Sequence, residues 1–330
     1  MWDLMLSDEQ AMIAESVAQF LAGELPIERL RPGAPEEDKA KLRADMAELG
    51  WFGIGIAEEA GGIGLGLVEE MLVQKGCGQH FASPSVLASV IAAHVAQAAG
   101  DREMREALVS GEMSAALGVA AGGDVVAFDW AADDLLVVWN QQGAGLFDPG
   151  SFASARSEPS LDDSLTLHRG TLGGPRHWID AAAEPIGLRA EVLLAARLAG
   201  LADRACLLAT EYAKMREQFG RPIGAFQAIK HRCADMFLRA ETSYHLTALA
   251  CLKLQAGTPD AALLVAAAKL KASHAAHENG RAAIQIHGGL GFHAECEAHW
   301  FMKRAHVYDQ AGGAMQTQAD RLFAAPPPIW

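Results

Sequence analysis

The segment REQFGRPIGAFQAIKHRCADM, residues 216–236, combines residue types that can bind an anion at the start of a helix. Arg216 could supply a guanidinium group, and Gly220 could let backbone N–H groups approach a ligand closely. The first N–H groups of a helix have no partner within the helix and often bind phosphate. The segment therefore indicates either an anion site or an ordinary turn, in which Arg216 would pair with Glu211 or Glu217.

Two other segments contain familiar residue types but fail the spacing of the sites they suggest. The glycine-rich loop at residues 50–66 lacks the G-x-G-x-x-G spacing of dinucleotide-binding folds, because the third position falls on Leu67 or Glu69. The segment HAECEAH at residues 293–299 offers zinc-ligand types, but their i, i+2, i+4, i+6 spacing scatters them around a helix. We therefore expect neither a dinucleotide fingerprint nor a metal site.

Composition excludes several classes of protein. The 330 residues carry a formal net charge of −14, and no basic stripe is present, so a nucleic-acid partner is not expected. The five cysteines are widely spaced and form no C-x-x-C pair, which predicts reduced thiols in a cytoplasmic protein. No uncharged stretch is long enough to span a membrane as a helix, and the N-terminus lacks the features of a signal peptide.

The pattern of apolar residues divides the chain into three parts. Residues 1–112 predict a helical N-terminal domain, residues 113–180 a small β domain, and residues 181–330 a C-terminal helical bundle. The first helix is expected to begin at the capping box of Ser7 and Gln10 and to end before Gly23, and further helices are expected at residues 36–49, 66–76, 84–99, 102–110, 186–215, 222–256, 259–287 and 295–322. Large apolar side chains at helical spacing are expected in the core, namely Trp51, Phe52, Phe226, Met236 and Phe237.

Four segments together resemble the acyl-CoA dehydrogenase family. They are the segment at 216–236, QIHGGLGF at 285–292, MLSDEQAMIAESVAQFL at 5–21 and AELGWFGIGIAEEAGG at 47–62. The resemblance runs nearly from end to end and is greatest to short bacterial members that degrade sterols and unusual acids, some of which pair two unlike subunits. It implies a mostly α fold with a helical N-terminal domain, a β domain and a C-terminal four-helix bundle that makes the oligomer contact.

The resemblance also implies FAD as cofactor. It places Arg216 near the FAD pyrophosphate, Phe219 against the adenosine and Gln227 within reach of the cofactor. It places Gln285, Gly288 and Gly289 beside the FAD held by the neighbouring subunit. A pyrophosphate requires a fixed guanidinium and backbone N–H donors, which agrees with an arginine and glycines at these positions.

The implied reaction removes a proton from Cα and a hydride from Cβ of an acyl-CoA thioester, giving the 2-enoyl-CoA. The electrons would leave to an electron-transfer flavoprotein. The implied assembly is a homodimer, a homotetramer or a heterotetramer with a second acyl-CoA dehydrogenase subunit.

The catalytic base departs from the family pattern. Many relatives carry it as the Glu of a Glu-Gly pair, and Gly312 occupies that position here. Others carry it early in the first bundle helix, where this chain has Ala190. Glu191 is adjacent, but one residue turns a side chain by about 100° on a helix. Glu191 and Asp309 are the candidate bases, beside the alternative that both are ordinary helix charges.

The middle segment departs from the family as well, because it is shorter than the family's β domain. The Thr/Ser-rich loop and the Gly-x-Lys strand that line the flavin ring in relatives have no counterpart. The segment ALGVAAGGDVVAFDWAADDLLVVW instead runs from the first strand directly into a later one. Three functions stay open: a catalytic dehydrogenase subunit, a non-catalytic subunit that completes the FAD pocket of an unlike partner, and a helical binding protein without flavin.

Overall fold

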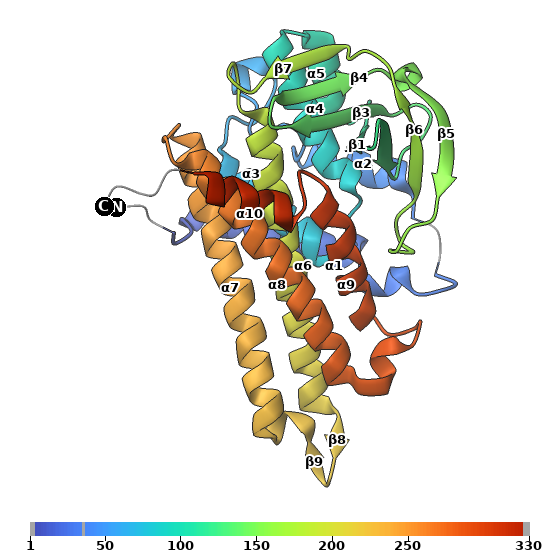
Figure 1. Cartoon of the computed structure of the whole chain (residues 1–330), viewed down its shortest axis with the longest axis vertical. Coiled ribbons are helices and arrows are strands. Elements are labelled where there is room, and N and C mark those ends of the chain that lie inside the picture. The colour runs from blue at the N-terminus through green and yellow to red at the C-terminus, as the bar shows by residue number, and fades with distance from the viewer. Residues whose placement is uncertain (1–3, 35–36, 326–330) are drawn as a thin grey trace.

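The computed structural model describes residues 4–34 and 37–325 (Figure 1). The N-terminal part contains α1 (Asp8–Glu24), α2 (Lys39–Glu48), α3 (Leu67–Gln79), α4 (Pro84–Ala99) and α5 (Arg102–Val109). Helix α1 begins at Asp8 because Ser7 accepts the N–H of Gln10 and the Gln10 side chain accepts the N–H of Ser7. The glycine-rich loop at residues 50–66 holds only the short 3-10 turn Glu58–Ala60.

The middle part is a seven-stranded sheet with the order β5-β6-β2-β1-β3-β4-β7. Its strands are β1 (Ala115–Ala121), β2 (Asp124–Phe128), β3 (Leu135–Asn140), β4 (Gly143–Phe147), β5 (Phe152–Glu158), β6 (Leu167–Leu172) and β7 (His177–Asp180). Neighbouring strands are antiparallel except for β1 and β3, which are parallel. Helix α4 packs against β1, β3, β4 and β7 and thereby joins the sheet to the N-terminal helices.

The C-terminal part is a bundle of long helices. It contains α6 (Ile186–Met215), α7 (Gln227–Gln255), α8 (Ala261–His287), α9 (Ala298–Gln310) and α10 (Met315–Ala324). The expected single helix at 295–322 is wrong, because Gly312 and Gly313 adopt positive φ angles of 67° and 93° and interrupt it. The short hairpin of β8 (Glu217–Gln218) and β9 (Arg221–Pro222) lies at the far end of the bundle from the sheet (Figure 1).

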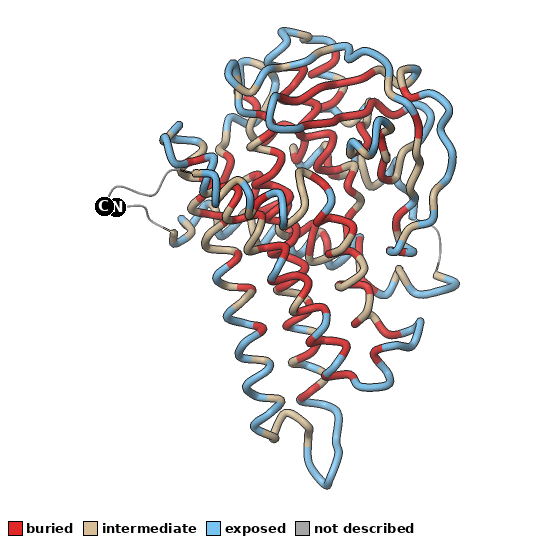
Figure 2. The backbone as a smooth tube through the Cα atoms, in the orientation of Figure 1, coloured by how far each residue is buried: buried red, intermediate tan, exposed pale blue. Residues whose placement is uncertain are grey.

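One hydrophobic core runs from the N-terminal helices through the sheet into the bundle. Figure 2 shows buried residues along α6 and α8, whereas much of α7 near the hairpin is exposed. Trp51, Phe52 and Met236 are buried as expected, but the expectation for Phe237 is wrong, since 59% of it is exposed on α7. No helix within residues 4–34 and 37–325 is long and apolar enough to cross a membrane.

A buried ionic cluster joins the N-terminal helices to the bundle. Glu70 of α3 is 2% exposed and accepts hydrogen bonds from His94 of α4 and Arg189 of α6. Burial by itself would raise the pKa of Glu70, but His94 and Arg189 outweigh it and lower the pKa to about 2. The cluster therefore fixes three helices relative to one another through one ionised carboxylate.

Candidate active site

A pocket of about 330 Å³ lies where the sheet meets α6 and the connection between α9 and α10. One wall comes from β1 and the β3–β4 hairpin, and the other from α6 and residues 310–321. Its lining includes amide, hydroxyl, guanidinium and carboxylate groups around one indole ring. A pocket with a few convergent polar groups at a junction between domains is a common form of binding site.

Glu191 places a carboxylate at this pocket from the second turn of α6. Only 3% of the residue is exposed, and Arg321 of α10 donates a hydrogen bond from Nη1 to Oε2 over 2.6 Å. Burial raises the pKa of Glu191, while Arg321 and Lys269 act in the opposite direction. A carboxylate whose pKa is raised by burial is a better proton acceptor than a solvated one, so this group can act as a base.

Gly312 lies directly beside Glu191. A Cβ atom built on Gly312 would lie 3.3 Å from Cγ of Glu191 and 3.2 Å from Nε1 of Trp139. Glu191 therefore lies beside the position at which, by the resemblance, many relatives carry their base.

The connection between α9 and α10 is held in place by two fully buried side chains. Nζ of Lys269 donates to the carbonyl oxygens of Asp309 and Gly313 over 3.2 and 3.5 Å, and Nε2 of Gln318 donates to that of Gly312 over 2.8 Å. Burial lowers the pKa of Lys269 to about 8, although Asp309 and Glu191 favour its charged form. These bonds fix the backbone of the pocket wall beside Glu191.

Asp309, the other candidate base, has a different environment. It is 6% exposed, and its Oδ1 accepts the N–H of Met315 over 3.2 Å. This contact caps the start of α10, and Asp309 is not among the residues that line the pocket. Of the two carboxylates, only Glu191 faces the cavity.

Two further residues of the pocket have no motif in the sequence that marks them. Trp139 at the end of β3 is 7% exposed, and its Nε1 has no hydrogen-bond partner among the described residues. Arg321 is the ion-pair partner of Glu191, 130 residues away along the chain. The only local signal for Arg321 was a lone basic residue in the last turn of a helix, which is common at surfaces.

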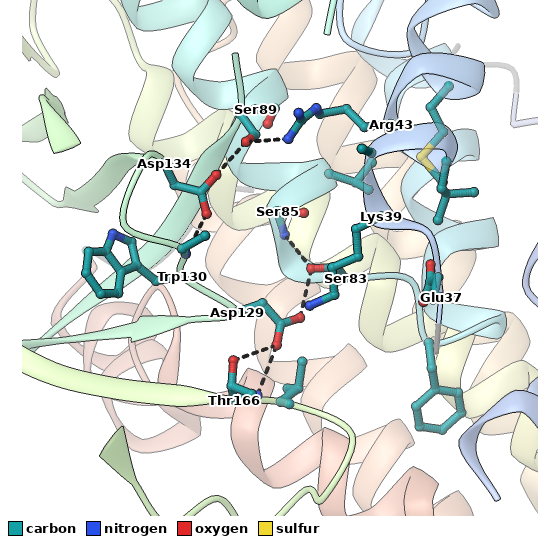
Figure 3. A pocket seen from close by; sticks show the side chains of 18 of the residues that line it. Glu37, Lys39, Arg43, Ser83, Ser85, Ser89, Asp129, Trp130, Asp134 and Thr166 are labelled. Carbon is teal, nitrogen blue, oxygen red and sulfur yellow. Dashed lines mark hydrogen bonds between the residues drawn. The ribbon is translucent and has the colours of Figure 1, made fainter. Parts of the chain in front are cut away.

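A second cavity, of about 360 Å³, lies between α2, α4 and the opposite ends of the sheet strands (Figure 3). Its polar side chains largely satisfy one another, as Figure 3 shows for Ser83 with Asp129 and for Asp129 with Thr166. Ser114 in turn bridges Arg43 and Asp134. These hydrogen bonds join helices to strand ends.

The residues expected to bind FAD lie at the far end of the bundle. Arg216, Phe219 and Gln227 are exposed at and beside the β8–β9 hairpin, and Phe219 is 92% exposed with a positive φ of 54°. The guanidinium of Arg216 forms no hydrogen bond or ion pair with any described residue. The alternative that Arg216 pairs with Glu211 or Glu217 is therefore wrong, and this cation is available to a ligand.

The end of α8 lies at the same end of the molecule. The ring of Tyr212 on α6 stacks on that of His287 on α8, with 4.1 Å between their centroids. Gln285, Gly288 and Gly289 are exposed beside this stack, and a Cβ atom on either glycine would meet nothing within 4 Å. An exposed guanidinium, aromatic ring, amide and open glycine backbone fit the adenosine and pyrophosphate part of FAD.

The two groups of residues cannot surround one cofactor within a single chain. Glu191 and Arg216 are 25 residues apart on α6, which corresponds to about 37 Å of helix. Near Glu191, β1 and β2 are joined by a two-residue turn at Gly122 and Gly123, with φ angles of 64° and 92°. The connection between β1 and β2 is therefore too short to contain a Thr/Ser-rich loop, in agreement with the absence of this loop from the sequence.

Residues 293–299 form no metal site. Helix α9 begins only at Ala298, so the expectation that these residues lie along a helix is wrong. His293 pairs with Glu295 instead, and the described part of the chain holds no group of three or more residues able to bind a metal ion.

The chain belongs to the acyl-CoA dehydrogenase family. Residues 7–115 match the acyl-CoA dehydrogenase N-terminal domain, and residues 189–325 match the C-terminal domain.

Individual relatives agree with this family. Acyl-CoA dehydrogenase IpdE2 of Mycobacterium tuberculosis is 31% identical over 303 residues, which cover 91% of each chain. Acyl-CoA dehydrogenase FadE34 of the same organism is 33% identical over 280 residues, and the chain spans only 39% of its length. Butyryl-CoA dehydrogenase from Megasphaera elsdenii has the same fold, with a TM-score of 0.82 and 21% identity over 98% of this chain and 99% of that one. The ChsE4–ChsE5 complex of M. tuberculosis contains a chain with a TM-score of 0.77 and 21% identity, over 98% of this chain and 100% of that one.

Proposed function

We propose that the chain is a subunit of a FAD-dependent acyl-CoA dehydrogenase and that Glu191 is its catalytic base. The observation that carries this proposal is the buried carboxylate of Glu191, which faces the pocket beside Gly312. The substrate is an acyl-CoA thioester, and the product is the 2-enoyl-CoA.

The chain's own residues contribute the proton transfer. Glu191 accepts the proton from Cα of the acyl group, and Arg321 keeps the carboxylate ionised before the substrate binds. Lys269 and Gln318 hold the backbone beside Glu191, which keeps this side of the pocket in a fixed position for the substrate. Bound FAD would supply the acceptor for the hydride from Cβ.

We also propose that the functional form is an oligomer. Arg216 and Gln285 lie far from Glu191, so they are placed to contact the FAD of a second subunit rather than that of their own chain. Apolar side chains gather around the same end, with Phe292 78%, Met215 75% and Leu238 61% exposed. Exposed apolar groups of this extent are typical of contact surfaces between subunits. An electron-transfer flavoprotein would then reoxidise the cofactor.

The test is a comparison of Glu191→Gln with Asp309→Asn in the purified assembly, using acyl-CoA and an artificial electron acceptor. Removal of a general base typically lowers the rate by about 10²–10⁴-fold, so Glu191→Gln should lose most of the activity. Asp309→Asn should retain it, since the neutral amide can still accept the N–H of Met315. Loss in Asp309→Asn with retention in Glu191→Gln would exclude Glu191 as the base.

A second candidate function is supported by the two-residue turn between β1 and β2. Without the loop that lines the flavin ring in relatives, the chain would complete the FAD pocket of an unlike, catalytic subunit. A chain that is colourless alone and yellow after co-expression with a second acyl-CoA dehydrogenase subunit, with activity unchanged in Glu191→Gln, would establish this function instead.

A further inference from the structure

The indole N–H of Trp139 is the unexplained polar group of the pocket. The residue is 7% exposed, yet Nε1 is buried without a hydrogen-bond partner among the described residues. An indole nitrogen can only donate, so no rearrangement of protons can satisfy it. Buried N–H groups of this kind are rare in folded proteins, and one that borders a pocket is available to a ligand.

The nitrogen lies beside the proposed base. The same point in space, the Cβ position of Gly312, is 3.2 Å from Nε1 of Trp139 and 3.3 Å from Cγ of Glu191. Any side chain at 312 would occupy this space, and glycine leaves it free. Gly313 follows with a positive φ, and Lys269 and Gln318 hold the backbone here, so the free space at the Cβ position of Gly312 is a fixed part of the pocket.

We propose, resting on the function proposed above, that Trp139 is a catalytic residue whose indole N–H donates a hydrogen bond to the thioester carbonyl oxygen of the bound acyl-CoA. When Glu191 takes the proton, the Cα–H bond breaks and its electron pair delocalises onto that oxygen. A fixed donor aimed at the oxygen then stabilises the charge as it develops. An α-proton abstraction requires a base for the proton and a hydrogen-bond donor for the carbonyl oxygen. Glu191 and Trp139 supply these two groups in one pocket.

A flavin ring also carries carbonyl oxygens and could accept the same hydrogen bond. In both cases the indole N–H would bind a carbonyl oxygen, so the test must distinguish the thioester from the flavin. It uses the CoA thioester of tert-butylacetic acid, which has no hydrogen on Cβ and cannot be dehydrogenated. Its partner is the matching CoA thioether, in which a methylene replaces the carbonyl group.

Calorimetric titration of both ligands into the purified assembly gives the affinity ratio of thioester to thioether. The wild-type protein should favour the thioester, and Trp139→Phe should reduce this ratio by about threefold to tenfold, the range for one neutral hydrogen bond. Because packing losses affect both ligands alike, they cancel in the ratio. Trp178→Phe is the control, since that indole donates to Asp180 over 3.1 Å on β7 and does not line the pocket.

Three outcomes would overturn the assignment. An unchanged ratio in Trp139→Phe, with normal flavin content, shows that the residue only packs. An unchanged ratio with a loss of bound flavin, measured by absorbance, shows that the indole holds the flavin carbonyl instead. Failure of the wild type to bind either ligand refutes the thioester contact. The proposed base is judged separately by the turnover of Glu191→Gln, so the two proposals can fail independently.

Discussion

Glu191 is subject to two opposing influences that set when it can act. Burial raises its pKa, while the guanidinium of Arg321, 2.6 Å away, favours the ionised form. A base must be deprotonated to work, so activity should be low at acidic pH and rise as pH increases through the pKa of Glu191. The rising limb should lie above the ordinary range of a glutamate.

The pH profile can be shifted by changing Arg321. In Arg321→Met the stabilising charge is lost, the pKa of Glu191 rises further, and the rising limb of kcat/KM should move upward by about one to two pH units. Arg321→Lys keeps a positive charge and should shift the rising limb of kcat/KM less than Arg321→Met does. The measurement is kcat/KM against pH for the three proteins. Identical limbs in all three would mean that Arg321 does not control the ionisation of the base.

At this scale the sequence was informative only in part. It identified Glu191 as a candidate but placed it one residue beyond the position used by relatives. Ala190 is fully buried, whereas the side chain of Glu191 lies beside Gly312. Which of these two side chains reaches the pocket depends on how α6 packs against α8 and the sheet. Trp139 and Arg321 belong to segments far apart in the chain, and no local pattern shows that tertiary packing brings them together.

The connection between α9 and α10 is the element that shapes the pocket. Its two glycines have positive φ angles, and three of its carbonyl oxygens are held by Lys269 and Gln318. The periodic pattern from 295 to 322 suggested one helix, because two glycines within an otherwise helical pattern are a weak signal. The left-handed backbone conformation of these two glycines ends α9 and turns the chain toward Glu191.

Gly312→Ala should therefore be destabilising. A left-handed backbone costs a residue with a Cβ atom about 1–2 kcal/mol, and the new methyl group would lie 3.2 Å from Trp139. The melting temperature should fall measurably in differential scanning calorimetry. Gly150→Ala is the matched control, because Gly150 has an ordinary φ and nothing within 4 Å of its Cβ position. Equal melting temperatures for the two variants would show that the turn is not constrained at Gly312.

At the scale of the whole molecule, the helical and β segments were the most predictable feature. Helix α6 spans Ile186–Met215, as the apolar pattern predicted, because a long Ala- and Leu-rich run between Pro185 and the Arg216 segment has clear limits. The exposure of Phe237 was not predictable, since a sequence does not distinguish an apolar side chain packed in the core from one that lies on the surface.

The cluster around Glu70 connects domains and should make stability depend on pH. The pKa of Glu70 is about 2 in the folded chain and about 4.3 in an unfolded one, so its contribution is complete above about 4.3 and is lost as pH falls toward 2. Glu70→Gln should lower the melting temperature at pH 7, and the difference from wild type should narrow below pH 4. Glu103→Gln, at an exposed site on α5, is the control. A difference that stays constant with pH would refute the role of the ionised carboxylate.

The separation of about 37 Å between Glu191 and Arg216 is one basis of the proposed assembly. The side chain of Arg216 forms no hydrogen bond or ion pair with any described residue, so its truncation should leave the fold intact. If Arg216 neutralises the pyrophosphate of a cofactor held across the subunit contact, Arg216→Ala should weaken flavin retention, and Arg216→Lys should weaken it less because the charge remains. Glu217→Gln, next to Arg216 on the hairpin, is the control. The measurement is the flavin-to-protein absorbance ratio after dialysis, with circular dichroism to check the helices. Equal flavin content in Arg216→Ala and wild type, both alone and co-expressed with a second subunit, would exclude this contact.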